Sequence, residues 1–424
     1  MFNRLKKYHV LIENIFSLFT IRGIEYILSF LTFPYLVRTI GISLFGSMAF
    51  AQSIIAYFSL FTDYGFNMTA PRDIARHDQK EERGKVFAAV FGAKLFLLLL
   101  SILPFLVLLV FLGLRTSYSP ALFAVTFLTV VGNVVSPVWF FQGIQQMRYI
   151  TLVNTVARLT TALGIFFIVK GPGDYLWAAF LQSIPAVIAG GISWWILINR
   201  YPEVCRVPQW NDVKAALKDG WDIFVSNIAI NLYTGSNTVI LGMMTNSTVV
   251  GYFSSAQKIV NAVQRGLQPV TQAIYPHISK LFEESQDSAL RFIRKIMKLY
   301  CGGNLGISLV LLFGADPIMH LLMGKVYGES VQMLRVLALL PFIISLSQIF
   351  GIQTMLPCGM NKEFSRIIIS SAILNTIMVF PLIYLLGGTG VCWSMLVTET
   401  FVTTTMGWTL HKKKVLNIPA SVST

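Results

Sequence analysis

The longest apolar run in the sequence is VFAAVFGAKLFLLLLSILPFLVLLVFLGL at residues 86–114, which contains a single charged residue, Lys94. A helix of about 20 such residues is long enough to cross the roughly 30 Å of hydrocarbon in a bilayer. Lipid offers the backbone no hydrogen-bond partner, and the run lacks the alternating pattern of a barrel strand. It therefore predicts a membrane-spanning helix.

Similar runs recur on both sides of this stretch. They lie near residues 15–37, 44–66, 120–142, 150–169, 175–198, 222–245, 249–275, 299–315, 331–355, 367–386 and 390–410. With 55% hydrophobic and 12% charged residues, the 424-residue chain has more apolar surface than a soluble fold can bury. The sequence therefore predicts an all-α integral membrane protein with about twelve transmembrane helices.

The basic residues are distributed unevenly between the two sides of the membrane. Segments on the side of the N-terminus contain 23 Lys and Arg residues, those on the opposite side contain four, and the spans contain six. This bias predicts that both termini are cytoplasmic. It also accounts for the net charge of +14, so we expect no nucleic acid as a partner.

The two halves of the chain resemble each other under a shift of 205 residues. Five pairs are then identical: Gly46 and Gly251, Ala51 and Ala256, Gln52 and Gln257, Ile54 and Ile259, and Pro71 and Pro276. Six spans per half is an even number, so the halves would be parallel repeats with the substrate site between them. We expect an N-terminal six-helix bundle at 1–198, a cytoplasmic linker at 199–221 and a C-terminal six-helix bundle at 222–424, around a central cavity.

Ionisable side chains within the spans mark candidate functional positions, because each costs about 2.5 to 3.5 kcal/mol in hydrocarbon. The basic ones are Arg22, Lys94, Arg158, Lys258, Arg265 and Arg335, and the acidic ones are Glu25, Asp63 and Glu399. The interior is therefore expected to be cationic. Lys94 and Arg335 lie close enough to span ends that we expect their side chains to reach the headgroups.

The clearest polar face belongs to the span at 249–275, where Lys258, Asn261, Arg265 and Gln268 are spaced by three and four residues. This spacing places them on one side of a helix, and we expect them to line a cavity. Other spans carry shorter polar faces. The candidate substrate-binding residues are Arg22, Arg158, Lys258, Arg265, Asn227, Asn231, Asn261 and Gln268.

Structural roles remain open for several of these residues. Arg22 and Glu25 are spaced to form an ion pair that only fixes helix packing, and Asn and Gln side chains often bridge neighbouring helices. Glu25, Asp63 and Glu399 are candidates for ion coupling, although Glu399 fits equally well as a neutral acid or as a partner for a basic residue. The sequence has no nucleotide-binding or hydrolase motif, so we expect no enzymatic activity, cofactor or metal site.

Four short segments resemble a known family: DYGF at 63–66, SNIAINLY at 226–233, VGYFSSAQKI at 250–259 and QAIYP at 272–276. Together with the two six-span halves they resemble the Wzx-type flippases of lipid-linked oligosaccharides. These belong to the multidrug/oligosaccharidyl-lipid/polysaccharide exporter superfamily, which has the MATE-like fold. The resemblance implies alternating-access movement of an undecaprenyl-pyrophosphate-linked O-antigen or similar repeat unit from the cytoplasmic to the periplasmic leaflet of a bacterial inner membrane.

In this interpretation the four basic candidates attract the pyrophosphate and the Asn and Gln candidates bind sugar hydroxyls. The implied partners are the polyprenyl-pyrophosphate-linked oligosaccharide, membrane lipid, and the polymerase and chain-length regulator of the same pathway. A drug or cation exporter of the superfamily remains an alternative, although it should have unpaired carboxylates in its cavity. A membrane-embedded glycan polymerase or ligase fits less well, because the loops opposite the termini are short, and a non-transporting scaffold is a further alternative.

Overall fold

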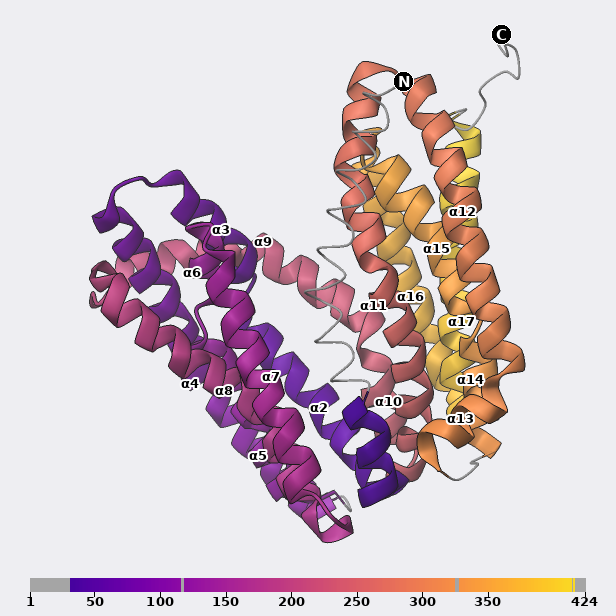
Figure 1. The fold of residues 1–424 in the computed structure, drawn as a ribbon, viewed down its shortest axis with the longest axis horizontal. Helices are drawn as coiled ribbons and strands as arrows, with labels where there is room; N and C mark the ends of the chain where they lie inside the picture. Colours follow the sequence, from indigo (N-terminus) through magenta and orange to yellow (C-terminus); the bar gives the residue numbers. More distant parts are fainter. Residues whose placement is uncertain (1–30, 116–117, 325–327, 414, 416–424) are drawn as a thin grey trace. The chain divides into compact units, whose positions relative to one another are not determined.

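The computed structural model describes residues 31–115, 118–324, 328–413 and 415, and the regular structure in these residues is helical, without strands (Figure 1). Each span expected after residue 40 coincides with one helix or with consecutive short helices. Within the described residues, eight helices are long and apolar enough to cross a membrane. Other expected spans are more polar or interrupted, as in the helix that carries Lys258 and Arg265. The predicted all-α membrane fold is confirmed.

The chain divides into two compact units, and the first extends over Leu28–Val239. Its helices are α2 (Ile42–Asp63), α3 (Phe66–Arg76), α4 (Lys80–Arg115), α5 (Pro120–Val135), α6 (Val138–Gly143), α7 (Met147–Ile168), α8 (Tyr175–Arg200) and α9 (Trp210–Thr234). α5 packs against α2, α4 and α8. Aromatic side chains fill part of this core, with the Phe87 ring centre 5.2 Å from that of Trp139 and 5.4 Å from that of Phe140.

α2 ends in a tight turn that determines where α3 lies. Tyr64 and Gly65 both have left-handed backbone angles, with φ of 49° and 86°. A Cβ atom at Gly65 would lie 2.6 Å from Cγ2 of Ile223 in α9. Glycine is therefore required here both by the backbone angle and by the close approach of α9.

The first unit includes α9. The sequence suggested a linker over residues 199–221, and along the chain the division into compact units falls between Val239 and Ile240. α9 packs against α2, α3 and α4, and its Val213 and Phe224 are buried in the core of the first unit. This apolar contact explains why residues 210–234 group with the N-terminal helices.

The second unit continues from Ile240, within α10 (Ser236–Met244). It contains α11 (Ser247–Glu284), α12 (Gln286–Phe313), α13 (Ala315–Met323), α14 (Gly328–Leu337), α15 (Leu340–Phe350), the π-helix η3 (Gly351–Met355), α16 (Asn361–Leu386) and α17 (Gly388–Lys412). α17 packs against α14, α15 and α16. The side chain of Asn246 accepts a hydrogen bond from the backbone of Val249 at 3.1 Å, which fixes the start of α11.

Helix positions support the internal repeat. α2 begins at residue 42 and α11 at residue 247, which corresponds to the shift of 205 residues found in the sequence. α4 and α12 begin at residues 80 and 286, one residue away from the same shift. Under this shift Pro269, inside the continuous α11, corresponds to Tyr64 in the turn that ends α2.

Candidate functional site

α11 carries the polar face that the sequence predicted, formed by Lys258, Asn261, Arg265 and Gln268 and called the α11 stripe below. Lys258 and Asn261 are half-buried and Arg265 and Gln268 are exposed, all on one side of the continuous helix. Lys258 and Arg265 are seven positions apart, which corresponds to about 10 Å along the helix axis. A long polyanionic group fits such a row of separated cations better than a single small anion does.

Another face of α11 holds the stripe in place. Phe253, Ala256 and Val260 are buried in the second unit. The hydroxyl of Ser330 in α14 donates to the carbonyl oxygen of Tyr252 at 3.1 Å. Within the described residues Arg265 has no ion-pair partner, so its guanidinium remains available for an anion.

The other described substrate-binding candidates belong to the first unit. Arg158 is exposed on α7, whereas Asn227 and Asn231 are half-buried on α9. The amide of Asn231 donates to the carbonyl oxygen of Asn227 at 3.0 Å, and this bond orients the side chain along the helix. Each unit therefore contains candidate substrate-binding residues. Arg22 and Glu25 lie outside the described residues.

Lys94 was expected to reach the headgroups, and this prediction is wrong. The side chain is 3% exposed, and its ammonium donates to Oδ1 of Asp63 at 3.2 Å. The amide of Asn67 donates to the same oxygen at 2.7 Å. Lys94 faces α2 because a buried cation is stabilised only beside an opposite charge. Arg335, in contrast, is exposed near the start of its span and pairs with Asp316.

The pairing of Lys94 with Asp63 is the feature of the site that sequence reasoning missed. The signal was present, since the two residues carry opposite charges near the adjoining ends of consecutive spans. Asp63 is thereby held by one cation and one amide. The third acidic candidate, Glu399, is half-buried on α17 in the other unit.

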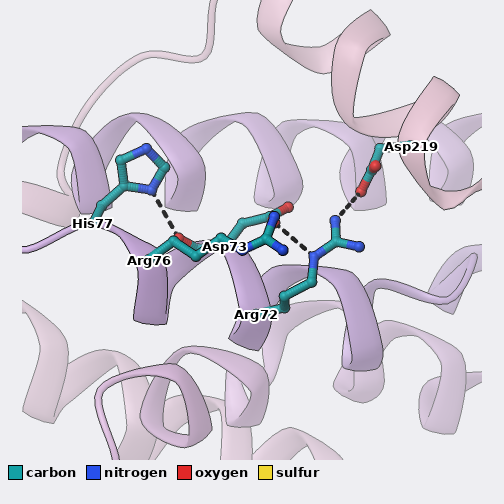
Figure 2. A network of polar contacts seen from close by, with 5 residues as sticks. All are labelled: Arg72, Asp73, Arg76, His77 and Asp219. Atoms are coloured by element: carbon teal, nitrogen blue, oxygen red, sulfur yellow. Dashed lines mark hydrogen bonds and ion pairs between the residues drawn. The ribbon is translucent and has the colours of Figure 1, made fainter.

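A second polar network joins α3 to α9 in the first unit (Figure 2). The guanidinium of Arg72 donates to Asp73 at 2.9 Å and to Asp219 of α9 at 2.7 Å. A ring nitrogen of His77 lies 2.8 Å from the carbonyl oxygen of Asp73. The ring of Tyr64 stacks on that of Phe224 with centres 4.4 Å apart, and so α9 contacts both the turn after α2 and the helix that follows it.

Known proteins resemble the chain over most of its length. The family model described as "Polysaccharide biosynthesis protein" matches residues 11–282. A protein of Escherichia coli (strain K12) named "Putative O-antigen transporter" is 35% identical over 413 residues, which cover 95% of this chain and 97% of that protein. A protein of the same name from Shigella dysenteriae is 31% identical, over 92% of this chain and 97% of its own length.

Solved structures show the same fold at low sequence identity. The lipid II flippase MurJ in an inward closed conformation matches with a TM-score of 0.75 and 14% identity, over 94% of this chain and 89% of MurJ. An inward-facing multidrug resistance MATE family transporter matches with a TM-score of 0.71 and 14% identity, over 93% of this chain and 100% of its own. The predicted MATE-like fold is confirmed. The chain belongs to the polysaccharide biosynthesis protein family and is a Wzx-type flippase of that family, a membrane transporter and not an enzyme.

Proposed function

We propose that the chain moves undecaprenyl-pyrophosphate-linked repeat units of O-antigen, or of a similar surface polysaccharide, from the cytoplasmic to the periplasmic leaflet of a bacterial inner membrane. The observation that carries the proposal is the basic and polar stripe of α11, formed by Lys258, Asn261, Arg265 and Gln268. The names of the relatives support the class of cargo.

The stripe suits the head of such a lipid. A pyrophosphate with attached sugars cannot cross hydrocarbon unaided, because unsatisfied polar groups cost several kcal/mol each (about 2 to 7 in apolar surroundings) and charges cost more. Lys258 and Arg265 would stabilise the phosphates, and arginine can bind phosphate oxygens with two parallel hydrogen bonds. Asn261 and Gln268 would bind sugar hydroxyls. Arg22, Arg158, Asn227 and Asn231 are the proposed substrate-binding residues of the N-terminal half.

Transport would proceed by alternating access, with both termini in the cytoplasm. The excess of basic residues on the side of the N-terminus supports this orientation. Glu25, Asp63 and Glu399 are the proposed ion-coupling residues, and Asp63 would act through its contact with Lys94. We propose the polymerase and the chain-length regulator of the same pathway as partners, because they would use the flipped repeat unit.

Complementation tests this function. A bacterial strain that lacks its own flippase would receive the wild-type chain, Lys258→Ala, Arg265→Ala or the control Lys280→Ala, at matched membrane levels. Lys280 is an exposed lysine of the same helix, outside the stripe. Wild type and the control should restore surface polysaccharide, whereas the two stripe variants should restore much less. Full restoration by Arg265→Ala and Lys258→Ala would remove these residues from the site.

The same strains test the drug exporter as the alternative. We consider the drug exporter because the chain shares its fold with a multidrug transporter. A transporter of cationic drugs should raise the resistance of a drug-sensitive host to cationic compounds, and stripe variants should not abolish surface polysaccharide. We expect unchanged drug sensitivity, because the stripe is cationic and would repel such compounds.

A further inference from the structure

Two arginines contact one buried tyrosine where the start of α7 lies beside the end of α8. Nη1 of Arg200 donates to the hydroxyl oxygen of Tyr149 at 2.6 Å, and Nη2 of Arg148 donates to it at 3.3 Å. The guanidinium carbons lie 5.7 and 5.0 Å from the centre of the same ring. Tyr149 is 8% exposed, whereas both arginines are exposed. All three residues belong to the first unit.

This arrangement concentrates positive charge. A guanidinium has five N–H donors, and the tyrosine accepts from each arginine through a single oxygen, so most donors remain available. Within the described residues neither Arg148 nor Arg200 forms an ion pair. Arg148 is also the second residue of α7, where the helix dipole adds further positive potential. An anion held between the two guanidiniums would relieve their repulsion.

The first turns of α7 carry exposed apolar side chains beside Arg148. Met147 precedes Arg148 directly and Leu152 follows it by four residues, on the same face of α7, and each is 56% exposed. Exposed apolar side chains within one helical turn of an exposed arginine are typical of the boundary between hydrocarbon and headgroups. The anion that fits this position is one attached to acyl chains.

We propose that Arg148, Arg200 and Tyr149 form a binding site for the phosphate of a resident anionic phospholipid, with the acyl chains against Met147 and Leu152. The tyrosine ring orients the two guanidiniums, and they provide the donors. Arg148 and Arg200 lie in segments that the charge bias places on the cytoplasmic side, where anionic lipids attract basic clusters. The site lies within one unit and shares no residue with the α11 stripe.

Lipid binding to the purified full-length chain tests this proposal. Native mass spectrometry would count bound phosphatidylglycerol and phosphatidylcholine for wild type, Arg148→Gln/Arg200→Gln and the control Arg291→Gln/Lys298→Gln. The control removes two exposed basic residues of α12. We expect the first double variant to bind phosphatidylglycerol about tenfold more weakly, with phosphatidylcholine unchanged and the control like wild type. Equal binding by wild type and the first variant, or an equal loss in the control, would overturn the proposal.

Two further arms identify the source of the phosphate and the role of the tyrosine. Inorganic phosphate at millimolar concentration should not displace the lipid, and displacement would show a site for free anions instead. Competition by a polyprenyl-pyrophosphate at equal concentration would show a cargo site and also overturn the proposal. Tyr149→Phe keeps the ring, which packs against Phe141 at 5.4 Å, and should weaken binding less than the arginine variant does. Binding is measured without transport, so this result is independent of the proposed cargo.

Discussion

Lys94 in α4 donates a hydrogen bond to Asp63 in α2 across 3.2 Å, and the lysine side chain is almost completely buried. Removing one partner of a buried ion pair leaves an uncompensated charge. We therefore expect Lys94→Met to destabilise the chain by about 3 kcal/mol. The thermal unfolding midpoint of the purified protein in detergent measures this change.

The matched double variant separates the ion pair from simple packing. In Asp63→Asn/Lys94→Met both charges are absent, and replacing a buried pair by neutral groups is often close to neutral. The double variant should therefore regain most of the unfolding midpoint lost in Lys94→Met. If it remained as unstable as the single variant, the charge pairing would not explain the burial of Lys94.

The turn after α2 gives a second prediction. Gly65→Ala introduces a methyl group 2.6 Å from Cγ2 of Ile223 at a φ of 86°, and we expect a low yield of folded protein. Gly41 provides the control, because its φ is 85° and a Cβ there would meet nothing within 4 Å. Gly41, with ψ of 160°, would meet only the backbone strain of this nearly glycine-only conformation, and Gly41→Ala should cost about 1 to 3 kcal/mol. Equal yields of the two variants in gel filtration would contradict the close approach of α9.

The contacts between α9 and the first helices should differ in strength. The Arg72 and Asp219 side chains are 44% and 47% exposed, so Arg72→Ala should cost at most about 1 kcal/mol. Phe224 is buried and stacks on Tyr64, and Phe224→Ala should cost roughly 3 kcal/mol. Thermal unfolding of both variants gives the comparison. A larger effect of Arg72→Ala would mean that the ion pair, not the aromatic contact, attaches α9.

The sequence predicts the helices and the polar stripe because both depend on local pattern. The run at 86–114 and the three-and-four spacing from Lys258 to Gln268 need no knowledge of partners. The placement of α9 depends instead on contacts between distant residues, such as Phe224 with Tyr64. The burial of Lys94 likewise depends on how α4 is rotated towards Asp63, and hydropathy does not report that rotation.

The meeting of Arg148 and Arg200 on Tyr149 illustrates the same limit. In the sequence these two arginines are separate contributions to the charge bias, more than fifty residues apart, within a total of 33 basic residues. Their convergence follows from the packing of α7 against α8. Tertiary packing thus converts a bias that indicates topology into a localised anion site.

Translocation by the purified chain in proteoliposomes tests the central claim most directly. A polyprenyl-pyrophosphate-linked oligosaccharide with a fluorophore on the sugar would be incorporated in both leaflets, and a membrane-impermeant reductant would quench the accessible fraction. Wild type and Lys280→Gln should make nearly the whole pool accessible, and Lys258→Gln/Arg265→Gln should do so at least about tenfold more slowly. If wild-type vesicles matched protein-free vesicles, or if the stripe variant matched wild type, the account would be contradicted.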